Sequence, residues 1–122
     1  MLDFVTGSVT GTGADIDVDL GFQPSYVKVI NRTQLGTAGN LVGLEWFQGM
    51  GDDNALGINA VQDDSSTTTY NLADKTSDGI TPIATNSVQT TDPVTVTGFN
   101  GFQIPAAFQS DGDELYYIAA RS

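Results

Sequence analysis

Residues 14–20 alternate apolar side chains with acidic ones, and this alternation limits the possible folds more than any other stretch of the chain. The apolar positions are Ala14, Ile16, Val18 and Leu20, and the acidic positions are Asp15, Asp17 and Asp19. A period of two residues indicates a β-strand with one buried side and one solvent-facing side. The strand should end within residues 21–24, because Pro24 lacks an N–H and fixes its own φ.

A second strand is expected at residues 26–30, directly after this turn. Its residues are Tyr26, Val27, Lys28, Val29 and Ile30, and all but the lysine are aromatic or β-branched. Such side chains suit a pleated, half-buried surface, and the lysine falls on the polar side. We therefore expect the two strands to pair with each other and to seed a β-sheet.

Further strand-forming runs follow at intervals of about ten residues. Strands are expected at residues 41–50, where Trp46 should be a packing anchor, and at residues 55–61, 67–70, 80–88 and 114–121. The polar residues 71–79 are typical of turns, or of a single helical turn. Asn100 and Gly101, with apolar residues on both sides, are typical of a two-residue hairpin turn. We expect Val94, Val96 and Phe99 on its entering strand and Phe102 and Ile104 on its returning strand.

This pattern predicts an all-β protein with a single β-sandwich or small barrel, jelly-roll-like, of about seven to eight short antiparallel strands. At 122 residues the chain suits one domain that needs no disulfide or metal. We expect residues 14–122 to form this domain, and residues 1–13 to form an amino-terminal arm or an edge strand.

Composition excludes several classes of function. The chain has no cysteine and no histidine, so it cannot use thiolate or imidazole chemistry. Its formal charge of −11 repels phosphate groups, so neither nucleic acid nor an anionic membrane is an expected partner. The amino terminus lacks the features of a signal peptide, which favours a soluble protein made in the cytoplasm.

The carboxylates allow two kinds of site, each with a simpler alternative. Asp15, Asp17 and Asp19 could gather a hard cation, but a solvated strand face is the expected interpretation because no calcium-loop spacing is present. Glu45 and Glu114 are the only glutamates and could form a glycosidase pair. No histidine or catalytic loop accompanies either one, so we expect no enzyme activity and no cofactor.

The aromatic residues could likewise form a sugar-binding platform, although packing is the expected role of residues this large. The candidates are Trp46, Phe99, Phe102, Phe108, Tyr116 and Tyr117.

Three segments together carry a family resemblance: DLGFQPSYVKVINR at residues 19–32, LEWFQGM at residues 44–50, and GFNGFQIP with DELYYIAAR near the carboxyl end. They resemble the small virion structural proteins of tailed bacteriophages. The resemblance lies in apolar strand patterns and turns, so it transfers no catalytic residue. It implies a non-enzymatic capsid decoration or cement protein on the capsid surface of the virion. The alternatives are a tail or fibre module that binds a host-surface glycan and, as a third, a carbohydrate-active enzyme.

The resemblance also implies partners and surfaces. The implied partners are the major capsid protein and further copies of this chain, as a homotrimer at a local threefold axis. The glycine-punctuated residues 1–13 are the candidate attaching arm, through Leu2, Phe4 and Val5. Tyr116 and Tyr117 on the last strand are the candidate oligomer face, with the core as their other possible location.

Overall fold

The computed structural model describes residues 3–36, 40–62, 68–84 and 100–121. The strands are β1 Asp3–Thr10, β2 Ile16–Asp19, β3 Tyr26–Asn31, β4 Leu41–Phe47, β5 Asn54–Gln62, β6 Thr68–Ala84, β7 Asn100–Ile104 and β8 Glu114–Arg121. Two short 3-10 turns, η1 Arg32–Gln34 and η2 Ala106–Phe108, are the helical elements of these described residues. The expected all-β fold with about eight antiparallel strands is therefore confirmed.

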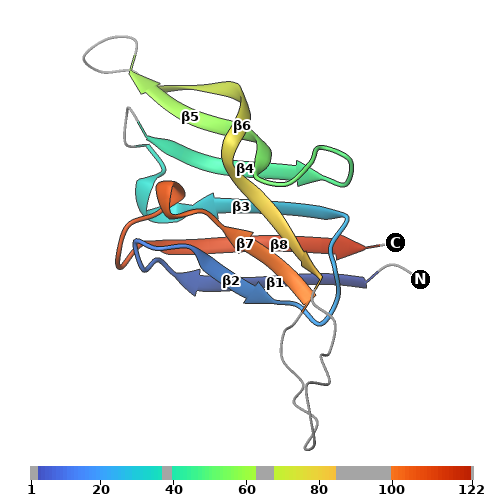
Figure 1. The fold of residues 1–122 in the computed structure, drawn as a ribbon. Coiled ribbons are helices and arrows are strands. Elements are labelled where there is room, and N and C mark those ends of the chain that lie inside the picture. The colour runs from blue at the N-terminus through green and yellow to red at the C-terminus, as the bar shows by residue number, and fades with distance from the viewer. Residues whose placement is uncertain (1–2, 37–39, 63–67, 85–99, 122) are drawn as a thin grey trace, which may run out of the picture.

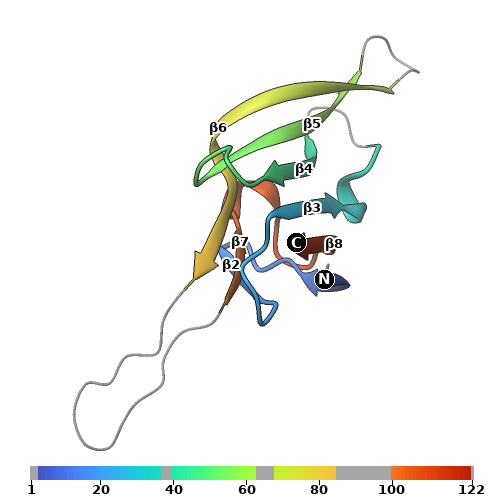
Figure 2. The same ribbon diagram turned by 90° about the vertical axis from the view of Figure 1, so that its right-hand side faces the viewer.

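The eight strands form one sheet in the order β1-β8-β3-β4-β5-β6-β7-β2. The sheet curls into a half-barrel because β6 belongs to both of its walls (Figures 1 and 2). The first half of β6 pairs with β5, and its last four residues pair with β7. Between the two halves, Asp78 has a positive φ of 56°, and the β5–β6 register shifts, so the strand changes direction there.

The hydrophobic core fills the space between the two walls of the half-barrel. Its buried members are Val18, Val27, Val29, Leu44, Trp46, Ala55, Ile80, Phe102, Ile104, Phe108, Leu115 and Ala119. Trp46 is among them and donates its indole Nε1–H to the carbonyl oxygen of Gly51 at 2.9 Å, so its polar atom is satisfied while its ring is buried.

The expected pairing of the first two predicted strands is wrong. β2 pairs with β7, whereas β3 pairs with β4 and β8. The connection between β2 and β3 carries the chain from one wall to the other, and Phe22 and Pro24 within it are buried. The apolar sides of the two strands therefore face each other across the core instead of lying in neighbouring positions of one wall.

The expected hairpin turn at Asn100–Gly101 is also wrong. Both residues belong to β7, where Gly101 lies opposite Ile83 of β6 and Asp19 of β2. A Cβ atom on Gly101 would lie 1.8 Å from the carbonyl oxygen of Val18. The glycine is thus required by the close approach of β2 and not by a turn. The expected entering strand, with Val94, Val96 and Phe99, lies outside the described residues.

The third difference concerns residues 71–79, which form the middle of β6 and not turns or a helical turn. Their polar side chains are tolerated because most of this part of β6 is exposed. The strand is held by backbone pairing, with residues 68–75 lying opposite residues 55–62 of β5. Of the strand expected at residues 80–88, residues 80–84 form the end of β6, and the rest lie outside the described residues.

A polar cluster ties the β1–β2 connection to the segment between β7 and β8. Gln109 Oε1 accepts hydrogen bonds from the N–H groups of Thr12 and Gly13, each at 2.8 Å. Nearby, the buried Asn31 donates through Nδ2 to Asp113 Oδ2 at 2.9 Å. These bonds satisfy buried polar groups and hold the chain where it crosses from one edge of the sheet to the other.

Asp113 is held as a carboxylate in this cluster. Its burial raises the pKa, but hydrogen bonds donated by Asn31, the Ser110 N–H and Gln34 lower it by more, so the net pKa lies below the ordinary value. The cluster therefore depends on the charged form of Asp113.

Candidate functional site

The solvent-facing side of strands β1, β8, β3 and β4, here called the outer face, is the candidate site. The burial of β3 alternates, so that Val27, Val29 and Asn31 are buried while Tyr26, Lys28 and Ile30 are partly exposed. Because residues opposite each other on neighbouring antiparallel strands point to the same side, the register extends this division to the other strands.

Outward-facing positions line up across the strands in rows, and most of the side chains in two of these rows are apolar. One row, continued onto β5 and β6, runs Ser8, Tyr116, Ile30, Gly43, Ile58 and Leu72. A second row runs Phe4, Ala120, Tyr26 and Phe47. Phe4 is 58% exposed, Phe47 46% and Tyr116 38%, which is unusual for side chains of this size. Strands β1, β8, β3 and β4 therefore carry large apolar side chains on the outer side as well as on the core side.

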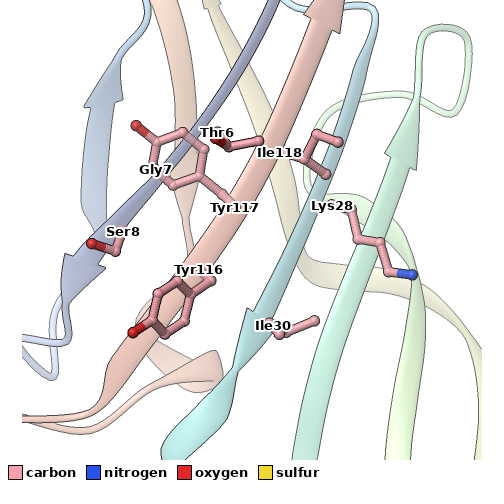
Figure 3. Close-up of a pocket in the computed structure, with 8 residues that line it drawn as sticks. All are labelled: Thr6, Gly7, Ser8, Lys28, Ile30, Tyr116, Tyr117 and Ile118. Carbon is pink, nitrogen blue, oxygen red and sulfur yellow. The ribbon is translucent and has the colours of Figure 1, made fainter.

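An open depression of about 620 Å³ lies on the outer face between β1, β8 and β3 (Figure 3). Its lining residues are Thr6, Gly7, Ser8, Lys28, Ile30, Tyr116, Tyr117 and Ile118. The guanidinium carbon of Arg32 lies 5.8 Å from the centre of the Tyr116 ring, within the distance of a cation–π contact.

Charge on the outer face is balanced, in contrast to the strongly acidic chain. Lys28 lies directly opposite Glu45. A second basic side chain, Arg32, contacts Tyr116, and a second acidic one, Glu114, is exposed two residues before Tyr116 on the same side of β8. Tyr26 donates its hydroxyl to Glu45 Oε2 at 2.6 Å. Burial, this hydrogen bond and the negative charge of Glu45 together raise the pKa of Tyr26 to about 12.

The predicted partner-binding residues are distributed over both sides of the sheet. Phe4 and Tyr116 point outward from β1 and β8, but they lie in different rows of the outer face. Val5 and Tyr117 lie on the inner side, and the ring of Tyr117 packs edge-on against Phe102 at 5.5 Å between centroids. Leu2 lies outside the described residues. Of the described members of this set, Phe4 and Tyr116 therefore belong to the candidate site.

The candidate aromatic platform is not assembled as a surface. Trp46, Phe102 and Phe108 are in the core, Tyr117 packs against it, and Tyr116 alone is exposed. Phe99 lies outside the described residues.

The two glutamates lie on strands separated by β3. Two strand spacings and four residues along β8 place their backbones roughly 16 Å apart. A glycosidase pair has carboxyl groups about 5 to 10 Å apart, so the positions of Glu45 and Glu114 do not favour that chemistry.

Asp15, Asp17 and Asp19 are exposed, and each accepts a different local hydrogen bond. The donors are the Ala106 N–H, the Gln103 side chain and the Gly21 N–H. In the described part of the chain, no three such side chains converge in a way that could hold a metal ion. The geometry matches a solvated strand side with local capping bonds.

Several outer-face residues were not singled out from the sequence, namely Ile30, Phe47 and Ile118. The available signal was the loss of alternation: residues 26–30 and 115–120 are apolar at odd and even positions alike. A strand that is apolar on both sides predicts either a buried strand or a contact surface.

The chain matches no known protein family model, no curated protein and no solved structure. Within the described residues, no helix is long and apolar enough to cross a membrane.

Proposed function

We propose that this protein is a non-enzymatic structural protein of a tailed-phage particle, a capsid decoration protein that binds the assembled head. The phage context rests on the sequence resemblance, and the major capsid protein is the corresponding partner. The outer face is the surface that makes this contact.

The observation that carries the proposal is the exposure of large apolar side chains on the outer face. Phe47 and Tyr116 are aromatic and point outward from β4 and β8, the two strands that flank β3. Exposed aromatic residues are enriched at protein interfaces, where a few of them supply most of the binding free energy. The balance of Lys28 and Arg32 against Glu45 and Glu114 lets the face approach a partner without the repulsion that the rest of the chain would generate.

The alternative, a tail or fibre module, would use the depression beside Tyr116 to bind a host-surface glycan. An aromatic ring lies there next to the hydroxyl-bearing Thr6 and Ser8, and these groups suit a sugar's apolar face and hydroxyls. Substitutions of Phe47 and Tyr116 test both functions.

The test is co-sedimentation of the purified protein with assembled capsids that lack it. We expect the wild type to bind, and the double variant Phe47→Ala/Tyr116→Ala to bind at least about tenfold more weakly. The matched control is Leu35→Ala/Tyr70→Ala, which removes two large exposed side chains away from strands β1, β8, β3 and β4. Failure of the wild type to bind capsids, or equal binding by both double variants, would contradict the proposal. Binding to host cells or polysaccharide instead would favour the fibre module.

A further inference from the structure

The outer edge of β1 is a long strand edge whose residues 4–10 are uncharged. Among the described residues, β1 pairs with β8 alone, and it is the terminal strand of the sheet order. Its eight residues pair with β8 without a register shift, contain neither lysine nor proline, and carry an ionisable group only at Asp3. Natural proteins usually protect such edges with charges, prolines, bulges or short length, because an open edge pairs with other strands.

The residues of this edge are nearly palindromic. The order Val5, Thr6, Gly7, Ser8, Val9 reads alike in both directions when the two hydroxyl residues are treated as equivalent. In an antiparallel pair with a twofold axis at Gly7, Thr6 would lie opposite Ser8 and Val5 opposite Val9 of the second copy. Hydroxyl pairs and β-branched pairs are both favourable cross-strand combinations.

We propose that β1 pairs antiparallel with β1 of a second copy of this chain, about a twofold axis at Gly7, and joins the two sheets into one. The register keeps the two sides of the sheet distinct. Val5, Gly7 and Val9 are partly buried on the inner side, while Phe4, Thr6 and Ser8 are exposed on the outer side. With the axis at Gly7, odd-numbered residues lie opposite odd-numbered residues and even opposite even, so the inner side and the outer side of the sheet each continue into the partner.

Charge favours this edge for self-pairing over the other edge. Two copies with a formal charge of −11 each repel one another, so they must meet where neither carries acidic groups. Residues 4–10 have no ionisable side chain, whereas the β2 edge has Asp17 and Asp19 within its four residues. The second copy is therefore the occupant that fits β1 in pattern and in charge.

The pairing is expected to give a dimer of moderate affinity, in place of the trimer that the family resemblance implies. A contact made by one strand edge is smaller than the roughly 800 Å² per partner of a typical stable interface, so dissociation in the micromolar range is expected. This inference does not depend on capsid binding, because the dimer forms from the purified protein alone.

The first experiment is sedimentation velocity over a range of protein concentrations. We expect a shift from monomer to dimer for the wild type and at least about tenfold weaker association for Thr6→Asp/Ser8→Asp, whose dimer would gather four carboxylates around the axis. The control Thr76→Asp/Ser77→Asp adds the same charge at exposed positions of β6 and should associate like the wild type. A monomer at every concentration, a trimer, or association unchanged by the β1 variant would overturn the proposal.

A second experiment keeps the proposal testable if the aspartate variant does not fold. The chain has no cysteine, so single cysteines can be introduced cleanly. Thr6→Cys copies mixed with Ser8→Cys copies should form the mixed disulfide at least about fivefold faster than either variant crosslinks with itself, because residues directly opposite on antiparallel strands lie about 5 Å apart. Equal rates for all three pairings would overturn the proposed register.

Discussion

The two edges of the sheet differ in length and in charge. β2 has four residues, and Asp17 and Asp19 occupy its exposed positions. β1 has eight residues and no ionisable side chain from position 4 to position 10. The β2 edge thus has two of the usual protections against pairing with other chains, and the β1 edge has neither.

This difference between the edges is informative because the chain as a whole is rich in acidic residues. Fifteen of its residues are acidic, and none of them lies within residues 4–10. A sheet that does not close has two edges, and among the described residues only the β2 edge is both short and charged along its length. Unprotected strand edges tend to pair with other strands, and this tendency is the basis of the proposed β1 pairing.

The edges are also coupled through the connection at residues 11–15. Gln109 and Asp113 bind this connection from the opposite segment, with the Gly11 N–H donating to the Asp113 carbonyl oxygen at 2.7 Å. Changes in this region should therefore alter both edges together, whereas changes within β2 or β1 should alter one.

The largest expected effect comes from Gly101→Ala, which should disrupt the pairing of β2 with β7. The added Cβ would lie 1.8 Å from the Val18 carbonyl oxygen, which is backbone and cannot rotate away. We expect a loss of about 3 kcal/mol in the free energy of unfolding, measured by urea denaturation with circular dichroism. The control Gly43→Ala meets the flexible Ile58 side chain at 3.0 Å and should cost clearly less. Equal losses would mean that β2 does not pack as described.

The next effect comes from Gln109→Ala, which releases the connection between the edges. The variant leaves the Thr12 and Gly13 N–H groups without their acceptor, and we expect a loss of about 2 kcal/mol in the free energy of unfolding. The control Gln103→Ala removes an exposed hydrogen bond to Asp17 and should cost less than about 0.5 kcal/mol. If both variants cost the same in urea denaturation, the Gln109 cluster is not the link between the edges.

Much of the fold could be predicted from the sequence where strands are rich in β-branched and aromatic residues. The strand expected at residues 114–121 matches β8, and those at residues 26–30, 41–50 and 55–61 match β3, β4 and β5 within a few residues. The pairing of β2 and the role of Gly101 could not be predicted, because both depend on contacts between segments far apart in the chain. The polar middle of β6 was missed for the same reason, since β5 supplies its hydrogen-bonding partners.

The candidate site could be predicted only in part. Tyr116 and Tyr117 are neighbours in sequence, yet one points outward and the other packs on Phe102. Because strand residues alternate, one of two adjacent tyrosines must face each side, and the sequence does not show which side faces solvent. The apolar residues on both sides of β3 and β8 were visible, but their meaning required the position of the core.

A smaller effect is expected from acid titration of Asp113, which supports the same connection. Its pKa is lowered in the folded state, so its contribution to stability is complete above about pH 5 and is lost as the pH falls through the folded-state value. Asp113→Asn should cost about 1.5 kcal/mol at neutral pH, and this cost should shrink as the pH falls to about 2.5. Urea denaturation at several pH values measures it, with the exposed Asp111→Asn as control. A cost that does not vary with pH would contradict the role of the charged form.

The smallest effect on stability is expected from Asp17→Asn/Asp19→Asn, which removes charge from the β2 edge while keeping its hydrogen bonds. Asparagine can still accept from Gln103 and from the Gly21 N–H, so the free energy of unfolding should change by less than about 0.5 kcal/mol.

Self-association of this variant should nevertheless increase, because an uncharged edge is open to pairing. The comparison is made in the Thr6→Asp/Ser8→Asp background, where the β1 contact is removed and any new association must involve another surface. Light scattering should then show more association than for Asp52→Asn/Asp74→Asn, which removes the same charge at exposed positions away from both edges. If the two variants scatter alike, the four-residue length of β2, and not its aspartates, protects that edge.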